Sequence, residues 1–332
     1  MKRLLPLLLI PAALFAAEEP RHPFAGRIER LDPAFDKLVA PDAKIEKLAE
    51  WFTWSEGPTW FEGGVVFSDV MENTAFRWKE GMTRAEIFLK PSGLTTHTPG
   101  IREPGSNGLA VDRQGRLLLA QHGDRRISRM EKTGSFSVVV DRFEGKRFNS
   151  PNDLAIRKSG EIYFTDPPYG LEGIANSPLR ELPFAGVYRI GTDGKVTLLT
   201  KEINYPNGIG FSPDEKVLYV AVSDNAATRV MAYDVQADGT IANGRTFYDA
   251  QQLRKPGVKG LCDGLKVDRD GNVWATGPGG VMVLSPAGKL IGHIVTNEAT
   301  GNCCWGDDGS TLYITADMFL VRVKTKTKGA GW

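Results

Sequence analysis

One short pattern occurs six times along the chain and limits the folds that the chain can adopt. Each unit begins with a polar residue, passes through a turn rich in Asp, Gly or Ser and ends with a second apolar strand; in five units an apolar or alternating stretch precedes the turn. The units begin at Glu56, Asn107, Asn152, Asn207, Asp263 and Asn302. A repeat of this kind indicates a structural unit arranged around an axis or along a stack.

The residues within each unit are typical of antiparallel β structure. Short strands rich in β-branched and aromatic residues are separated by turns such as "DRQG", "KSG", "SPDE" and "DRDG", which suit hairpins. No long segment keeps a helical period. A repeat of this length with about four strands per unit is the pattern of a β-propeller. We therefore predict an all-β, six-bladed β-propeller that forms one domain over residues 44–325.

The two ends of the chain are predicted to differ from this domain. The segment "MKRLLPLLLIPAALFAAEEP" has a basic start, an apolar stretch and small residues before Glu18, which is the pattern of a signal peptide over residues 1–17. An N-terminal extension is then expected over 18–43. Residues 326–332 are expected to be a solvated, mildly basic tail. The mature protein is thus predicted to be exported, either periplasmic or secreted, without a membrane segment.

Charge and cysteine content exclude several classes of protein. The formal net charge of +1 favours neither nucleic acid nor a membrane surface as partner. The three cysteines, Cys262, Cys303 and Cys304, are too few for a disulfide framework and lack zinc-site spacing, so we expect buried packing residues. The expected partner is a small molecule, and the expected assembly is a monomer or a weak homo-oligomer.

The first residues of the six units should meet at one mouth of the central channel, because each lies at the start of an innermost strand. None of the six is Lys or Arg, and two are carboxylates. Asn-Gly and Asp-Gly are also favoured turn dipeptides, which is the simpler interpretation of each pair alone. Glu56 is a poor turn former in the same register, however, and partly buried carboxylates need compensating charge. This ring predicts a divalent cation, with calcium preferred for oxygen ligands; magnesium, manganese or zinc is an alternative.

Several stretches together resemble the gluconolactonase / senescence-marker-protein-30 family of six-bladed propeller lactonases. They include "SEGPTW", "NSPNDLAI", "YFTDPPYGL", "YPNGIGFSPDEKVLYV" and "CDGLKVDRDGNVW", and they extend from about Ser55 to Val323. The pieces "REPGSNGL" and "QHGDRR" are more similar to the bacterial gluconolactonase branch than to the animal one. The resemblance covers most of the mature chain.

The resemblance implies a metal site and a closure of the ring of blades. Its metal ligands would be Glu56, Asn207 and Asp263, and Asn152 would bind the metal or hold the substrate. A strand within residues 44–54 would pair with the C-terminal strands. The animal pattern "RFNDG" is replaced here by "RFNSPND". Arg147 and Asn149 are therefore weaker candidates for contacts with a sugar.

Lactone hydrolysis requires a polarised carbonyl, a delivered water and a stabilised oxyanion, and a bound cation can perform the first and last tasks. Asp263 is our candidate for the base that takes a proton from water, with direct attack by its carboxylate as an alternative. The candidates for substrate binding are Asn107, His122, Asn152, Arg102 and Glu103. No G-x-S-x-G, phosphate-loop or dinucleotide motif is present.

The sequence thus predicts an exported, calcium-dependent lactonase that converts sugar lactones such as glucono-1,5-lactone to aldonic acids. Two alternatives stay open, because a fold does not determine a function. One is another hydrolase on the same metal site, acting on organophosphate esters or other lactones. The other is a non-catalytic propeller that binds a carbohydrate or a protein.

Overall fold

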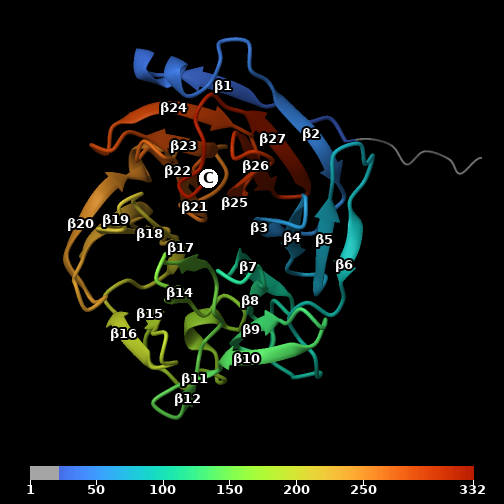
Figure 1. The fold of residues 1–332 in the computed structure, drawn as a ribbon, viewed down its shortest axis with the longest axis vertical. Helices are drawn as coiled ribbons and strands as arrows, with labels where there is room; N and C mark the ends of the chain where they lie inside the picture. Colours follow the sequence, from blue (N-terminus) through green and yellow to red (C-terminus); the bar gives the residue numbers. More distant parts are fainter. Residues whose placement is uncertain (1–21) are drawn as a thin grey trace, which may run out of the picture.

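Six β-sheets are arranged around a central channel in the computed structural model, which describes residues 22–332. Figure 1 shows the sheets as blades that follow one another around the ring in chain order. This arrangement confirms the predicted all-β, six-bladed propeller. The predicted signal peptide, residues 1–17, lies outside the described residues.

The first three blades are four-stranded antiparallel sheets whose first strand faces the channel. Blade 1 contains β3 (Ser55–Phe61), β4 (Gly64–Asp69), β5 (Thr74–Trp78) and β6 (Glu86–Leu89). Blade 2 contains β7 (Ser106–Val111), β8 (Leu117–Gln121), β9 (Arg126–Met130) and β10 (Phe136–Val140). Blade 3 contains β13 (Leu154–Ile156), β14 (Ile162–Asp166), β15 (Gly186–Ile190) and β16 (Val196–Thr200). A small hairpin of β11 (Arg142–Phe143) and β12 (Lys146–Arg147) connects blades 2 and 3.

The other three blades continue the same order, and the N-terminal strands complete the last two. Blade 4 contains β17 (Pro206–Phe211), β18 (Val217–Val222), β19 (Arg229–Val235) and β20 (Ile241–Asp249). Blade 5 contains β21 (Leu265–Val267), β22 (Val273–Gly277), β23 (Gly280–Leu284), β24 (Leu290–Val295) and β1 (Arg27–Arg30). Blade 6 contains β25 (Thr300–Gly306), β26 (Thr311–Ala316), β27 (Phe319–Lys324) and β2 (Ile45–Glu50).

The ring is closed by β2, which pairs antiparallel with β27 and so joins the two ends of the propeller in one sheet. This confirms the predicted closing strand within residues 44–54. The segment before it, predicted to be an extension, also takes part in the fold: β1 pairs with β24, and the 3-10 helix η1 (Pro33–Lys37) buries Phe35 against Trp274 and its neighbours. Two further 3-10 helices, η2 (Ile174–Asn176) and η3 (Ala250–Leu253), lie in loops.

The C-terminal tail lies against blades 5 and 6, and Figure 1 shows the C-terminus inside the ring of blades. The prediction of a solvated tail is wrong, because main-chain bonds hold it: Ala330 N donates to Val267 O (2.9 Å), and Gly329 N donates to Gly309 O (3.0 Å). Thr327 is buried as well. The tail therefore covers part of one end of the channel.

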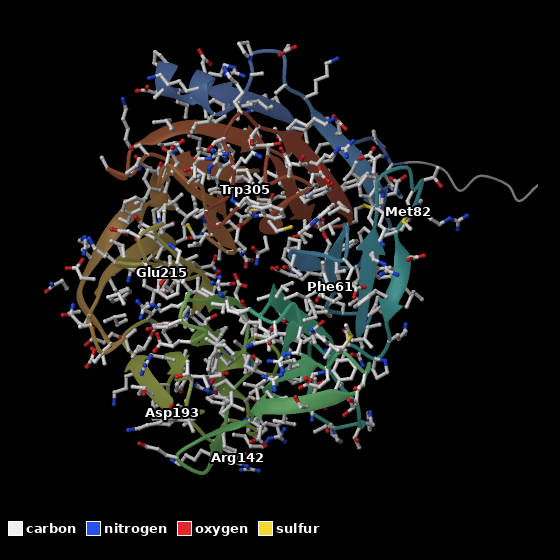
Figure 2. The ribbon with its side chains drawn as sticks, in the orientation of Figure 1. Phe61, Met82, Arg142, Asp193, Glu215 and Trp305 are labelled. Carbon is white, nitrogen blue, oxygen red and sulfur yellow. The ribbon has the colours of Figure 1, made fainter. Side chains whose placement is uncertain are left out.

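Apolar side chains fill the spaces between neighbouring blades, since strands of adjacent sheets contribute to the same buried clusters. All three cysteines are buried and free, as predicted. Figure 2 shows Trp305 near the channel and Arg142 and Asp193 at the outer rim. Within residues 22–332, no helix has the length and apolar character needed to cross a membrane.

Candidate active site at one mouth of the channel

A register shift at the start of the innermost strand brings the first residue of the unit to the channel mouth. In four blades the pairing with the second strand skips a residue here, for example between Glu56 and Thr59 in β3 and between Pro206 and Ile209 in β17. Such a bulge redirects a side chain and often lies beside an active site. The shift recurs in β7 and β25. Five of the six predicted positions line one pocket, and the sixth, Asn302, contacts Asp153 beside it; we call the six positions the oxygen ring.

The glycines that follow the ring residues allow neighbouring blades to approach closely. Gly108 N donates to Asn152 O (2.7 Å), and Gly208 N donates to Asp263 O (2.9 Å). A side chain at Gly208 would overlap the carbonyl oxygen of Asp263. Neither glycine has a positive φ. The Asn-Gly pairs are therefore junctions between blades, and the simpler interpretation as hairpin turns is wrong.

The oxygen ring carries buried oxygen atoms that have no hydrogen-bond partner. These are the Oδ1 atoms of Asn107, Asn152, Asn207 and Asp263. All four residues line a pocket of about 930 Å³, and so does Glu56. A buried oxygen without a partner costs free energy, on the order of 1–3 kcal/mol for a neutral group. Because these acceptor oxygens lie in one pocket, they fit a ligand that is a cation or that donates hydrogen bonds.

Two carboxyl groups of the ring lie next to each other. Burial raises the pKa of Glu56, and burial together with the charge of Glu56 raises the pKa of Asp263. Asp153, which follows the ring residue of blade 3, adds to both effects by its charge. Two adjacent carboxylates repel each other when both are ionised, so a cation between them would stabilise the ionised pair.

The donor set fits a hard divalent cation. Two carboxylates and the free amide oxygens are the ligands that calcium accepts. No group of three or more His, Cys, Asp or Glu side chains within residues 22–332 is arranged to hold a metal ion, so an ion at this site needs the amide oxygens. Glu56, Asn152, Asn207 and Asp263 are the predicted ligands, and all four line the same pocket.

Asn302, the sixth ring residue, is different because both ends of its amide are engaged. Its Nδ2 donates to Asp153 Oδ2 (3.2 Å), and its Oδ1 accepts from Lys266 Nζ (3.3 Å) and from the backbone of Cys303 (2.9 Å). Lys266 Nζ also lies 3.7 Å from Asp153 Oδ2. Burial alone would lower the pKa of Lys266, but Asp153 and other acidic groups raise it. A permanent cation thus lies beside the ring.

Glu103 is a further carboxylate in the pocket and is held at both oxygens. Its Oε1 lies 2.8 Å from Nη1 of Arg102, and its Oε2 lies 2.9 Å from Nδ1 of His122. Arg102 and Glu103 line the pocket, whereas His122 is fully buried behind Glu103 and does not line it. Of the five predicted substrate-binding residues, four therefore line the pocket, namely Arg102, Glu103, Asn107 and Asn152, and His122 supports Glu103 from behind.

The two weaker candidates, Arg147 and Asn149, lie outside the pocket. Asn149 Nδ2 donates to Asp166 Oδ2 (3.1 Å), and Asp166 also accepts from the backbone of Asn149 and of Ser150 (2.8 Å each). Arg147 Nη2 donates to the carbonyl of Asp124 (2.7 Å). Asn149 therefore holds the loop before β13, which carries Asn152, and Arg147 joins β12 to the loop between β8 and β9.

Sequence reasoning missed the aromatic wall of the pocket. Tyr169 and Tyr205 stack with ring centroids 5.7 Å apart, and both line the pocket together with Trp54. The Tyr169 hydroxyl donates to the carbonyl of Ser223 (3.1 Å), whose Oγ accepts from Asn207 Nδ2 (3.0 Å). Ser223 therefore turns the free oxygen of Asn207 toward the pocket. The "YPN" at Tyr205 was the available signal, because it places an aromatic ring two residues before a ring position.

Six antiparallel blades around one channel place the chain in the class of six-bladed β-propellers, and five residues of the oxygen ring line a pocket at one mouth. The sequence profile described as "SMP-30/Gluconolactonase/LRE-like region" matches residues 54–317. The chain therefore belongs to the SMP-30/gluconolactonase/LRE-like family. The family resemblance noted in the sequence is thereby confirmed.

Individual relatives agree with this membership. The chain is 41% identical over 315 residues to a gluconolactonase of Zymomonas mobilis, covering 92% of this chain and 87% of the relative. It is 29% identical to the pentonolactonase XacC of Haloferax volcanii, covering 78% of this chain and 80% of the relative. A solved gluconolactonase structure from Xanthomonas campestris matches with a TM-score of 0.78 and 32% identity, covering 93% and 99% of the two chains.

Proposed function

We propose that this protein is an exported, metal-dependent lactonase that hydrolyses sugar lactones such as glucono-1,5-lactone to aldonic acids. As a member of its family, the chain is a hydrolase of carboxylic ester bonds. The observation that carries the metal dependence is the set of buried, unpartnered oxygens in the oxygen ring. The relatives named as a gluconolactonase and a pentonolactonase support a sugar lactone as the substrate class.

The cation would be held by Glu56, Asn152, Asn207 and Asp263, with calcium preferred for a mixed carboxylate and amide set. When bound, such an ion supplies Lewis-acid chemistry, which polarises a carbonyl and stabilises an oxyanion. The Asn207 amide is held by Ser223 through its nitrogen, so its oxygen is already oriented before any ion binds. This preorganisation reduces the cost of assembling the site.

Asp263 is the proposed proton acceptor for the attacking water. The water oxygen bonds to the lactone carbonyl carbon, its proton passes to the Asp263 carboxylate, and the ring C–O bond breaks. The proton then passes to the leaving oxygen, which becomes the free hydroxyl of the aldonic acid. Direct attack by Asp263 is the competing route. It forms a mixed anhydride as the ring C–O bond breaks, and when water opens this anhydride at the Asp263 carboxyl carbon, a single turnover in ¹⁸O water leaves an unlabelled Asp263 oxygen in the product.

Arg102, Glu103 and Asn107 are the proposed contacts for the substrate hydroxyls. Glu103 is only 8% exposed and is fixed by Arg102 and by His122. A carboxylate that cannot rotate accepts hydrogen bonds from hydroxyls at defined positions, which favours a polyhydroxylated ligand. His122 is therefore proposed to position Glu103 and not to touch the substrate.

Export is the second part of the proposal and rests on the signal pattern of residues 1–17 alone. N-terminal sequencing of the protein recovered from the periplasm or the medium tests it. A mature N-terminus near residue 18 is expected, and a full-length intracellular protein would contradict export.

The experiment for the catalytic part follows proton release on a panel of lactones and phosphoesters. Purified protein is stripped of metal with a chelator, assayed, and assayed again after calcium is returned. We expect sugar-lactone hydrolysis to be lost and then restored. Unchanged hydrolysis in the stripped protein would refute the metal dependence, and hydrolysis of phosphoesters alone would refute the substrate class.

A further inference from the structure

Lys266 is a partly buried cation that the proposed reaction does not use. It lies on β21, three residues after Asp263, and its side chain is 25% exposed and lines the pocket of about 500 Å³ at the mouth opposite the oxygen ring. Its Nζ donates to the carbonyl of Leu265 (3.0 Å) and to Asn302 Oδ1 (3.3 Å). A buried ammonium is costly unless it is paired, so its partners are informative.

The nearest negative group is Asp153, at 3.7 Å from Lys266 Nζ. The Asp153 side chain is only 2% exposed. Its Oδ1 accepts from the backbone of Leu154 (2.8 Å), and its Oδ2 accepts from Asn302 Nδ2 (3.2 Å). Asn302 therefore links Asp153 and Lys266 with both ends of its amide. This closed arrangement explains why Asn302 alone among the amides of the oxygen ring has no free oxygen.

When Lys266 is counted, the fixed charges around the ring leave the net negative charge that one divalent cation would neutralise. Glu103 is paired with Arg102 and contributes no net charge. Glu56, Asp263 and Asp153 are the remaining carboxylates, and Lys266 offsets one of them. The net charge that is left equals that of one divalent cation with opposite sign.

We propose that Lys266 acts as a counter-charge: its ammonium lowers the net negative charge of the oxygen ring to the amount that a single divalent cation neutralises. This inference rests on the metal site of the proposed function. Lys266 neutralises Asp153 and so limits how strongly the three carboxylates together attract cations. It is a positioning residue, because it acts through Asp153 and Asn302 and lies on the channel side of the ring.

The test measures calcium affinity by isothermal titration calorimetry on metal-stripped full-length protein. Removing the ammonium in K266M should tighten calcium binding at least about tenfold, since a repulsive charge in a poorly screened site is lost. K266R keeps the charge and should stay within about threefold of the parent, by the same argument. D153N should weaken binding at least about tenfold, and K266M/D153N should return close to the parent. Unchanged or weaker binding in K266M would overturn the proposal.

A metal-free readout separates this inference from the metal proposal. In a double-mutant cycle on urea unfolding without metal, Lys266 and Asp153 should be coupled at least about fivefold in the unfolding equilibrium constant. If the parent binds no calcium but this coupling is found, the metal site fails while the counter-charge role stands. Additive effects in the cycle would overturn the counter-charge.

Folding is checked for every variant by far-UV circular dichroism, with K266Q as a second uncharged form. If K266M and K266Q fail to fold while K266M/D153N folds, the inference is supported, because the double variant lacks the same ammonium. If the double variant also fails while K266R folds, the counter-charge is overturned, because the role of Lys266 is then packing and not balance of charge.

Discussion

The two mouths of the channel are built by the same six inner strands but present different side chains to their pockets. At the first mouth, the early residues of the strands present the oxygen ring to a pocket of about 930 Å³. At the second mouth, later residues of the same strands line a pocket of about 500 Å³ with aromatic side chains such as Trp60, Phe211 and Trp305, and charged side chains such as Lys266 and Glu215 line it as well. The C-terminal residues 330–332 also line this second pocket.

The difference shows that position along an inner strand decides the role of a residue. In β17, Asn207 has a free buried oxygen at the first mouth, whereas Phe211 packs against Tyr163 toward the second. The first mouth carries unsatisfied acceptors, which a stable scaffold alone would not require. The second mouth is closed by ordinary main-chain bonds to the tail. We therefore assign chemistry to the first mouth and stability to the second.

The largest expected effect is at Asp263. Replacing it in D263N removes the charge but keeps the shape, so kcat/KM for a sugar lactone should fall by about 10²–10⁴-fold. D193N serves as a control, because Asp193 lies at the outer rim and accepts only a turn hydrogen bond from Lys195. Steady-state kinetics by proton release measure both. An active D263N would remove Asp263 from the mechanism.

Substitutions at two glycines of β17, Gly208 near the first mouth and Gly210 near the second, test the difference between the mouths within one strand. A methyl group at Gly208 would overlap the backbone of Asp263, so G208A should cost about 1–3 kcal/mol of unfolding free energy. Because it would also displace the ring, kcat/KM should fall by about 100-fold. At Gly210, toward the second mouth, the nearest atom is Leu265 Cδ1 at 2.8 Å, a side-chain end that can move. Urea unfolding and kinetics should show G210A close to the parent; equal losses in both variants would contradict the assignment.

Ser223 tests whether orientation of the ring amides matters. In S223A, the nitrogen of Asn207 loses its 3.0 Å partner, and calcium affinity should weaken by about tenfold while the fold is kept. S128A is the matched control, because the buried hydroxyl of Ser128 has no hydrogen-bond partner and lies on β9. Calorimetric titration gives both affinities. Equal calcium affinity in S223A and the parent would mean that Asn207 needs no support.

The smallest effect on activity is expected at the second mouth. Deleting residues 326–332 removes the bonds of Gly329 and Ala330 and uncovers Trp305, which should cost about 2 kcal/mol of stability. The urea midpoint should fall, and kcat/KM should stay close to that of the full chain. A large loss of kcat/KM in a folded truncated protein would show that the second mouth takes part in the reaction.

Much of the fold and part of the site could be predicted because both follow a repeat. Glu56 and Asp263 occupy the same register in their units, and a repeat carries equal positions to one mouth. Asn302 shares that register, but Asp153 and Lys266 engage it, and contacts between units leave no periodic signal. Lys266 was missed for the same reason, since it lies three residues beyond the ring position.

The loops and the tail were the least predictable parts. Tyr169 and Tyr205 stack from loops of different blades, and nothing in their local sequence links them. His122 was expected at the substrate, but its burial behind Glu103 depends on packing around Gly170. The sequence predicts a solvated tail because the charge of residues 326–332 is visible in it, whereas their main-chain partners depend on the fold.

The central claim is that one divalent cation binds at the first mouth, and an anomalous diffraction experiment on crystals soaked with manganese tests it most directly. We predict one strong peak in direct contact with Glu56 and Asp263, at about 2.0–2.6 Å from carboxylate and amide oxygens of the ring. A crystal with no peak at the oxygen ring, or with its main peak at the second mouth, would contradict the account.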